Sequence, residues 1–160
     1  MGVKSKLIAS LEVKSGGHSV QDIFHVNTHH IPNIIPSKIN HFEIHEGQIV
    51  KDSSIVSWKY NEEPTPLVFF NLNVIDGKKK IVKEVIEAFD PQKKSIIWKV
   101  IEGDLLELYN YFTIITSSED QWTIWTLVYE KKTKDTPEPL TFMGAVLDLT
   151  KDIDAHLLKK

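Results

Sequence analysis

The residues of this sequence best suited to metal chemistry are its histidines, of which there are seven. Two groups stand out by their spacing: the adjacent His29 and His30, and the pair His41 and His45. Side chains four residues apart on a strand share a face but lie roughly 13 Å apart, which is too far to ligate one ion. Adjacent side chains point apart in most backbones. We therefore expect no metal site and interpret these histidines as partly exposed polar residues.

Other familiar catalytic patterns do not occur in the sequence. There is no cysteine, which excludes disulfides, thiolate metal sites and a catalytic cysteine. The Gly-x-Ser-x-Gly nucleophile elbow and the glycine-rich phosphate-binding and dinucleotide-binding motifs are also missing. A ribonuclease activity has no recognisable catalytic pair. We expect no cofactor.

The composition is that of an ordinary globular protein, with 41% hydrophobic and 26% charged residues. The net charge of −3 offers nucleic acid no attraction, and the lysine clusters at residues 78–80 and 131–134 are offset by neighbouring acids. Apolar runs such as residues 67–70 are far too short to span a bilayer. Residues 1–6 lack the pattern of a secretory signal. We expect a cytoplasmic protein that neither binds nucleic acid nor inserts into membranes.

Strand-like patterns occupy most of the chain. A short helix is expected through Val20 and Phe24, capped by Ser15 or Ser19, with at most one further helical turn before Pro36. The connections between the later strands are too short for crossover helices, which indicates antiparallel pairing. Alternating or β-branched runs predict strands at residues 6–13, 39–45, 55–60, 67–75, 95–102, 105–116 and 122–131.

Residues 80–89 fit two interpretations. Apolar residues from Ile81 to Phe89 recur at helical spacing, so periodicity alone predicts a helix. The β-branched content of the segment and the strands on either side favour a strand. We predict a strand.

A long helix is predicted at the carboxyl end of the chain. Thr136 suits the N-cap, and Pro137 suits the first helical position. The apolar residues from Leu140 to Leu158 form a broad face on a rod about 30 Å long. Because this rod must cover a large apolar surface, we predict a single α+β domain over residues 1–160, in which a curved antiparallel sheet wraps around the helix.

This architecture raises the question of what fills the concave side of the sheet. A strongly twisted sheet of about seven strands curls, and one helix about 10 Å across cannot fill the trough. Aromatic strand residues commonly pack a core, but rings with a few polar tips are also typical of ligand pockets. Both a filled core and an open cavity fit the sequence. The residues that we expect to bind a ligand are Glu84, Trp98, Val100, Tyr109, Tyr111, Trp125, Leu127, Tyr129, Leu140, Met143 and Leu147.

Short motifs are distributed along the whole chain. The most characteristic are Ile-Glu-Gly-Asp-Leu-Leu-Glu-Leu-Tyr at residues 101–109 and Trp-Thr-Leu-Val-Tyr-Glu-Lys at residues 125–131. Together these motifs resemble the major latex protein branch of the Bet v 1-like (pathogenesis-related class 10) plant proteins. Further segments that fit this resemblance are residues 4–17, 76–78, 84–90 and 150–153.

The resemblance implies a seven-stranded sheet that grips the long helix, with two short helices supporting the far end of that helix. It also implies an internal cavity that accepts sterols, fatty acids, flavonoids or hormones, and a link to defence and stress. A few relatives are enzymes of alkaloid biosynthesis that use ionisable groups in the same cavity.

By the same resemblance, Glu84 lies in the middle of a strand, where its side chain can reach the cavity. Burial there would raise its pKa toward general acid–base use, and Tyr109 or Tyr111 could supply a hydroxyl group. An exposed Glu84 paired with Lys83 or Lys99 is the commoner arrangement for a strand glutamate.

Two segments depart from the family pattern. The loop at residues 47–54 keeps one glycine where the family has a glycine-rich loop, so a phosphate-cradling backbone is not expected. The connection at residues 63–75 is longer than a tight hairpin. It either extends a hairpin, covers the cavity mouth or represents retained intron sequence.

The function that we expect is binding or carriage of a small hydrophobic ligand, associated with plant defence or stress. One alternative is an isomerase or condensing enzyme that uses the same cavity, with Glu84 as its ionisable group. Another is an interaction module with a filled core, in which residues 62–75 form the partner surface. We expect a monomer or a weak dimer.

Overall fold

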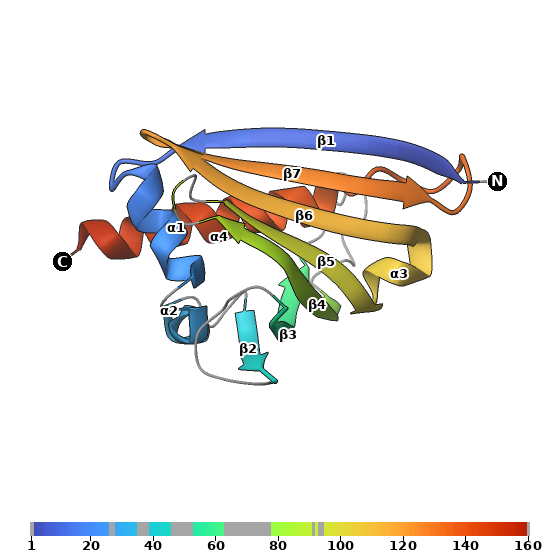
Figure 1. The fold of residues 1–160 in the computed structure, drawn as a ribbon, viewed down its shortest axis with the longest axis horizontal. Helices are drawn as coiled ribbons and strands as arrows, with labels where there is room; N and C mark the ends of the chain where they lie inside the picture. Colours follow the sequence, from blue (N-terminus) through green and yellow to red (C-terminus); the bar gives the residue numbers. More distant parts are fainter. Residues whose placement is uncertain are drawn as a thin grey trace, which may run out of the picture.

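The computed structural model describes residues 2–25, 28–34, 39–45, 53–62, 78–90, 92 and 95–159. The described strands form one curved seven-stranded sheet in the order β1-β7-β6-β5-β4-β3-β2, and every neighbouring pair is antiparallel (Figure 1). This confirms the predicted fold class. The strands are β1 (Val3–Glu12), β2 (Ile39–Ile44), β3 (Ile55–Glu62), β4 (Lys78–Asp90), β5 (Ser95–Gly103), β6 (Tyr109–Glu119) and β7 (Trp122–Lys131).

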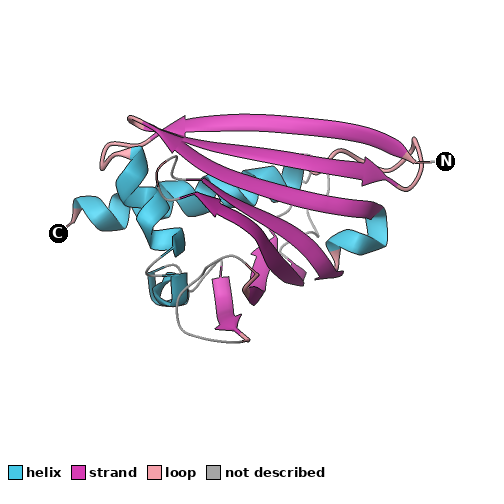
Figure 2. Cartoon of the chain, in the orientation of Figure 1, coloured by secondary structure: helices cyan, strands magenta, loops and turns pink. Residues whose placement is uncertain are grey.

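The helices lie against this sheet or at its ends (Figure 2). The longest, α4 (Leu140–Leu158), runs along the concave face and contacts β1, β3 and β7. The short helices α1 (Gly17–His25) and α2 (Ile31–Ile34), with the 3-10 turn η1 (Thr28–His30) between them, lie beside the carboxyl half of α4. No helix in the described parts of the chain is long and apolar enough to cross a membrane.

The ambiguous segment at residues 80–89 is part of strand β4, as predicted. Val82 and Ile86 are buried on the concave face, whereas Ile81 is 51% exposed. Apolar residues therefore occur on both faces of this strand. The apolar residues of the two faces, taken together, recur at the spacing of a helix, which explains the ambiguity of the sequence.

The predicted strand at residues 105–116 is wrong at its beginning, because α3 (Leu105–Leu108) is a helical turn and β6 starts at Tyr109. The chain turns at Gly103, whose φ is +125°. Asp104 then holds the turn against β4. Its backbone N–H donates to the carbonyl of Ile81 at 3.0 Å, and its carboxylate accepts the Ile81 N–H at 2.7 Å.

The expected start of the long helix is also wrong. Helix α4 begins at Leu140 with Pro139 as its N-cap, three residues later than the predicted first position at Pro137. The preceding loop is held by the sheet, since the Tyr109 hydroxyl donates to the Pro137 carbonyl at 2.6 Å. Thr136, the predicted cap, instead accepts a hydrogen bond from the backbone of Thr133.

Side-chain hydrogen bonds fix α4 in place. The indole of Trp125 on β7 donates to the Thr150 hydroxyl at 2.9 Å, and that hydroxyl donates to the Val146 carbonyl. Further along, the Asp154 carboxylate accepts the backbone N–H groups of Lys14 and Ser15 and the Ser15 hydroxyl. The turn after β1 is thereby tied to the helix, and Ser15 serves this bond rather than a cap on α1.

Two glycines provide a matched test of the backbone. A Cβ atom at Gly103 would clash with the Ile81 carbonyl and would require an unfavourable positive φ. Gly144 lies in α4 with open space around it. We expect Gly103→Ala to lower the free energy of unfolding by at least about 2 kcal/mol and Gly144→Ala to raise it by about 0.5–1 kcal/mol. Urea unfolding followed by circular dichroism measures both, and equal effects would contradict this account of the turn.

Candidate ligand-binding pocket

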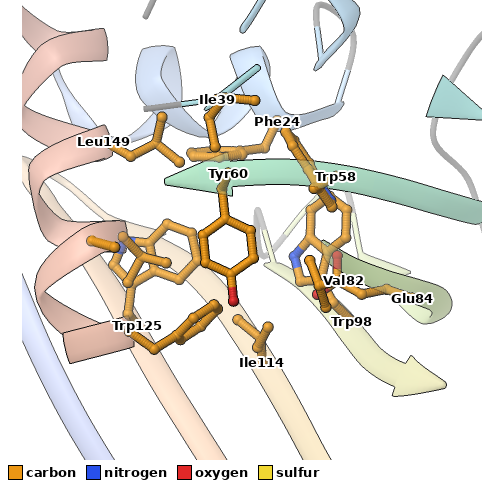
Figure 3. A pocket seen from close by; sticks show the side chains of 13 residues that line it. Phe24, Ile39, Trp58, Tyr60, Val82, Glu84, Trp98, Ile114, Trp125 and Leu149 are labelled. Carbon is orange, nitrogen blue, oxygen red and sulfur yellow. The ribbon is translucent and has the colours of Figure 1, made fainter. Parts of the chain in front are cut away.

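A pocket lies between α4 and the concave face of the sheet (Figure 3). The space that the centres of water-sized molecules can reach is about 70 Å³, and the whole hollow, including its solvent-open part, is about 610 Å³. Six aromatic residues line it: Phe24, Trp58, Tyr60, Trp98, Trp125 and Phe142. Six aliphatic residues complete its apolar wall: Ile39, Val82, Ile114, Ala145, Val146 and Leu149. The remaining lining residue is Glu84.

The spacing of the lining residues follows from their elements. Trp58 and Tyr60 lie two apart on β3, and Val82 and Glu84 lie two apart on β4, so each pair shares one face of its strand. The α4 residues occur at helical spacing, beginning at Phe142 and ending at Leu149. Strand alternation and helical periodicity therefore converge on the same hollow.

The polar edges of two lining tryptophans are already hydrogen-bonded to the protein. The Trp98 indole donates to the Thr116 hydroxyl at 3.1 Å, and the Trp125 indole donates to Thr150. Both residues are buried, at 3% and 4% exposure. They therefore present hydrocarbon surface to the pocket rather than free donors.

Glu84 is the one lining residue with a carboxyl group, and it is buried at 3% exposure. It pairs with Val56 of β3 and Val100 of β5, next to a register shift in the β4–β5 ladder. Burial raises the pKa of its carboxyl to about 8, while a hydrogen bond from Trp58 acts in the opposite direction. The carboxyl is therefore mostly neutral at pH 7.

The alternative of an exposed Glu84 that pairs with a neighbouring lysine is wrong. Lys83 lies on the outer face and forms its ion pair with Glu102 at 3.3 Å. Lys99 is exposed on β5, beside the buried Trp98. Alternation along β4 and β5 turns both lysines away from the pocket.

The residues that were predicted to bind a ligand lie in several different environments. Three of them, Glu84, Trp98 and Trp125, line the pocket. Three others are buried in the core but lie outside the lining: Val100, Leu127 and Met143. Leu147 packs against the core and is only partly buried, whereas Leu140 is 62% exposed.

Tyr109 and Tyr129 pack with Phe112 and Phe142 in what we call the aromatic cluster. Ring centroids within it lie 5.2 to 5.8 Å apart. The Tyr129 hydroxyl donates to the Glu138 carboxylate, which also pairs with Lys131. The cluster fills the trough near the start of α4, so filled core and open pocket occur side by side.

Tyr111 was expected on the concave face together with Tyr109, and this placement is wrong. The β6–β7 register shifts between these two residues. The bulge reverses the alternation, so Phe112 is fully buried while Tyr111 is only partly buried on the outer face. A hydroxyl from Tyr111 is therefore directed away from Glu84.

Sequence reasoning did not identify Trp58, Tyr60 or Phe142 as lining residues. The alternation of β3 gives a usable signal for the first two, because both share a face with buried Val56. Phe142 stands one helical turn before Val146, another lining residue. The contribution of Phe24 depends on how α1 folds back over the sheet, which local patterns do not reveal.

His41 on β2 and His45 just after it both lie against the carboxylate of Glu43. His41 and His45 lie 3.6 Å and 3.5 Å from the two carboxylate oxygens of Glu43, and His45 also contacts the Ser57 hydroxyl at 2.7 Å. Within the described ranges, no group of three histidines or acids could hold a metal ion. The loop at residues 46–52, the connection at residues 63–77 and the side chain of His29 lie outside the described residues.

The fold agrees with comparisons to known proteins. Residues 3–160 match the model of the pathogenesis-related protein Bet v 1 family, and the chain belongs to this family. It is 35% identical over 159 residues to MLP-like protein 43 of Arabidopsis thaliana, an alignment that covers 96% of this chain and 92% of the relative. MLP-like protein 31 of the same plant is 34% identical, with 97% and 86% covered.

A solved structure gives the same result. The fold is similar to that of major latex-like protein 151 from ginseng (Panax ginseng), with a TM-score of 0.83 and 32% identity. The match covers 96% of this chain and 97% of the ginseng chain. The resemblance to the major latex protein branch is confirmed.

The buried carboxyl of Glu84 predicts a characteristic dependence of stability on pH. Its pKa is near 4.5 in the unfolded chain and about 8 in the folded one. Its favourable contribution is complete below pH 4.5 and is lost as pH rises through 8, at about 1.4 kcal/mol per pH unit in between. Because glutamine does not ionise, the stability of Glu84→Gln should exceed that of the wild type by a margin that grows over this range.

Urea unfolding at several pH values measures this margin. The matched control is Glu87→Gln, which changes an exposed glutamate on the same strand and should leave the pH profile unchanged. A margin that stays constant with pH would show that Glu84 is ionised in the folded protein.

Proposed function

We propose that this protein binds a small hydrophobic ligand in the pocket between α4 and the sheet and acts as a carrier or sensor of that ligand. The observation that carries this proposal is a hollow walled by six aromatic and six aliphatic residues, which the side chains of the described residues do not fill. Such walls, with very few polar groups, are typical of ligand sites. The proposed setting is the plant cytosol, in defence or stress responses.

The hollow is large enough to support useful affinity. The space open to the centres of water-sized molecules is about 70 Å³, which holds only part of a typical ligand, and the surrounding hollow of about 610 Å³ continues into solvent. The ligand therefore extends from the enclosed part through the open side. Burying about 300 Å² of apolar ligand surface contributes roughly 7 kcal/mol before the costs of binding, so micromolar affinity is reasonable.

Catalysis in the same pocket is less well supported. Glu84, with a pKa near 8, has a property of general acids and bases. A hydroxyl from Tyr109 or Tyr111 was expected to assist it, but Tyr109 donates to the Pro137 carbonyl in the connection to α4 and Tyr111 lies on the outer face. An interaction function through residues 62–75 depends on a segment that lies almost entirely outside the described residues.

A matched pair of substitutions on α4 tests the binding proposal. Ala145 lines the pocket, whereas Ala155 is exposed on the same helix. Because an indole at position 145 would occupy the hollow, Ala145→Trp should lower the affinity for the neutral fluorescent probe N-phenylnaphthylamine at least about tenfold. Ala155→Trp should bind it as the wild type does.

Fluorescence titration gives both affinities, and circular dichroism shows whether each variant folds. Failure of the wild type to take up the probe saturably would refute the proposal. Equal affinity of the two folded variants would place the probe elsewhere.

A further inference from the structure

The chemistry of the pocket depends on a single carboxyl group. Of the side chains that line it, Glu84 alone belongs to an acid, and none is a lysine, arginine or histidine. In Figure 3, Glu84 lies beside Trp58 and Trp98, on the opposite side of the pocket from Leu149 of α4. A ligand in this pocket therefore meets hydrocarbon on most sides, one carboxyl and the hydroxyl of Tyr60.

The surroundings of Glu84 determine which form of the carboxyl the ligand meets. From β3, the facing groups are the Trp58 indole and the titratable Tyr60; from β4, β5, β6 and β7 they are Val82, Trp98, Ile114 and Trp125. From α1, β2 and α4 the lining is entirely apolar. No charged group among these described lining residues balances an ionised Glu84. This agrees with the raised pKa of about 8.

The hydrogen bond from Trp58 assigns a role to one oxygen of the Glu84 carboxyl. The indole N–H can only donate, so one oxygen of the Glu84 carboxyl acts as an acceptor. In the neutral acid the other oxygen carries the proton. A ligand oxygen can accept a hydrogen bond from this O–H.

The cost of burying a charge, which keeps Glu84 neutral, also applies to an anionic ligand. Its carboxylate would be buried against the same apolar wall, with no lysine, arginine or histidine in the lining to compensate the charge. A cationic amine would need Glu84 in its ionised form. Carboxylates that remain ionised when buried are normally held by two or three donors, whereas Glu84 has the Trp58 indole.

We propose that Glu84 is the specificity-determining residue of the pocket. In its protonated form, it donates a hydrogen bond to the oxygen of a neutral, otherwise apolar ligand such as an alcohol or a ketone, and the site discriminates against carboxylates. This inference rests on the proposed binding function and narrows its ligand class. It divides the hydrophobic ligands that the family resemblance implies, because sterol-like alcohols are accepted and ionised fatty acids are not.

The proposal has a consequence for the pH dependence of binding. A ketone, which can only accept a hydrogen bond, binds with full affinity while the Glu84 carboxyl is protonated and can donate to it. Above about pH 8, its affinity should fall, approaching tenfold for each further pH unit. A purely apolar ligand without an acceptor should show a smaller change.

The test is a competition assay with matched ligands. N-phenylnaphthylamine is bound to the wild-type protein and displaced at neutral pH by decanol, decanoate or decylamine, which share one chain length and differ in the head group. We expect decanol to bind roughly tenfold or more tightly than decanoate. A titration with 2-decanone, whose carbonyl oxygen accepts a hydrogen bond but cannot donate one, is then carried out from about pH 6 to about pH 10.

Variants at one position assign the effect to Glu84. Glu84→Met removes the donor at similar length and should lower the affinity for decanol about three- to tenfold. Glu84→Gln keeps a donor that does not titrate, so its affinity for 2-decanone should be independent of pH. The control is Glu87→Gln, an exposed site on the same strand, which should reproduce the wild-type profile.

The outcomes separate this inference from the function on which it rests. If the wild type takes up the probe but decanoate competes as well as decanol, the inference is overturned and the binding function stands. Stronger competition by decylamine overturns it as well, because Glu84 then acts as an anion. A Glu84→Met protein that folds and binds decanol as tightly as the wild type has the same consequence. No probe uptake by the wild type refutes both proposals.

Discussion

The whole structure depends on the packing of one helix against a sheet that is much wider than the helix. The 19 residues of α4 face seven strands, and a helix about 10 Å across can cover only part of that concave surface. Everything else on this face must be filled by side chains, covered by other elements or left open. The short helices α1 and α2 cover one end, beside the carboxyl half of α4.

The protein meets this constraint differently at two places in the trough. Near the start of α4, the aromatic cluster fills the space, and the hydroxyls of Tyr109 and Tyr129 hold the loop before the helix. Toward β3 and β4, large rings surround a hollow without closing it. Residue type alone does not separate the two places, because both are lined by aromatic residues. What differs is that the tyrosine hydroxyls of the cluster hold the loop before α4, whereas the Trp125 indole at the hollow holds the helix itself.

The fold was largely predictable from sequence because its determinants are local. Alternation specifies the strands, a broad apolar stripe specifies α4, and the short connections require antiparallel neighbours. The pocket was predictable only in part, because its lining depends on register. One bulge after Tyr109 moves Tyr111 to the outer face, and nothing in the composition of β6 reveals it.

The loop before α4 shows the same limit on a smaller scale. Thr136 and Pro137 have the residue types of a helix start, but tertiary hydrogen bonds from the sheet hold this stretch in another conformation. The turn after Gly103 likewise depends on a backbone partner, Ile81, that lies on a neighbouring strand. Local propensity predicts what a segment can form, whereas long-range partners decide which of these possibilities is realised.

The tryptophans have a consequence of a different kind. Of the four in the chain, Trp58, Trp98 and Trp125 line the pocket, while Trp122 is 42% exposed at the beginning of β7. Three of the four indole rings that contribute to the intrinsic fluorescence of this protein therefore lie at the walls of the hollow. A bound ligand that displaces water from these rings or quenches them therefore changes the tryptophan fluorescence spectrum, and no added dye is needed to detect it.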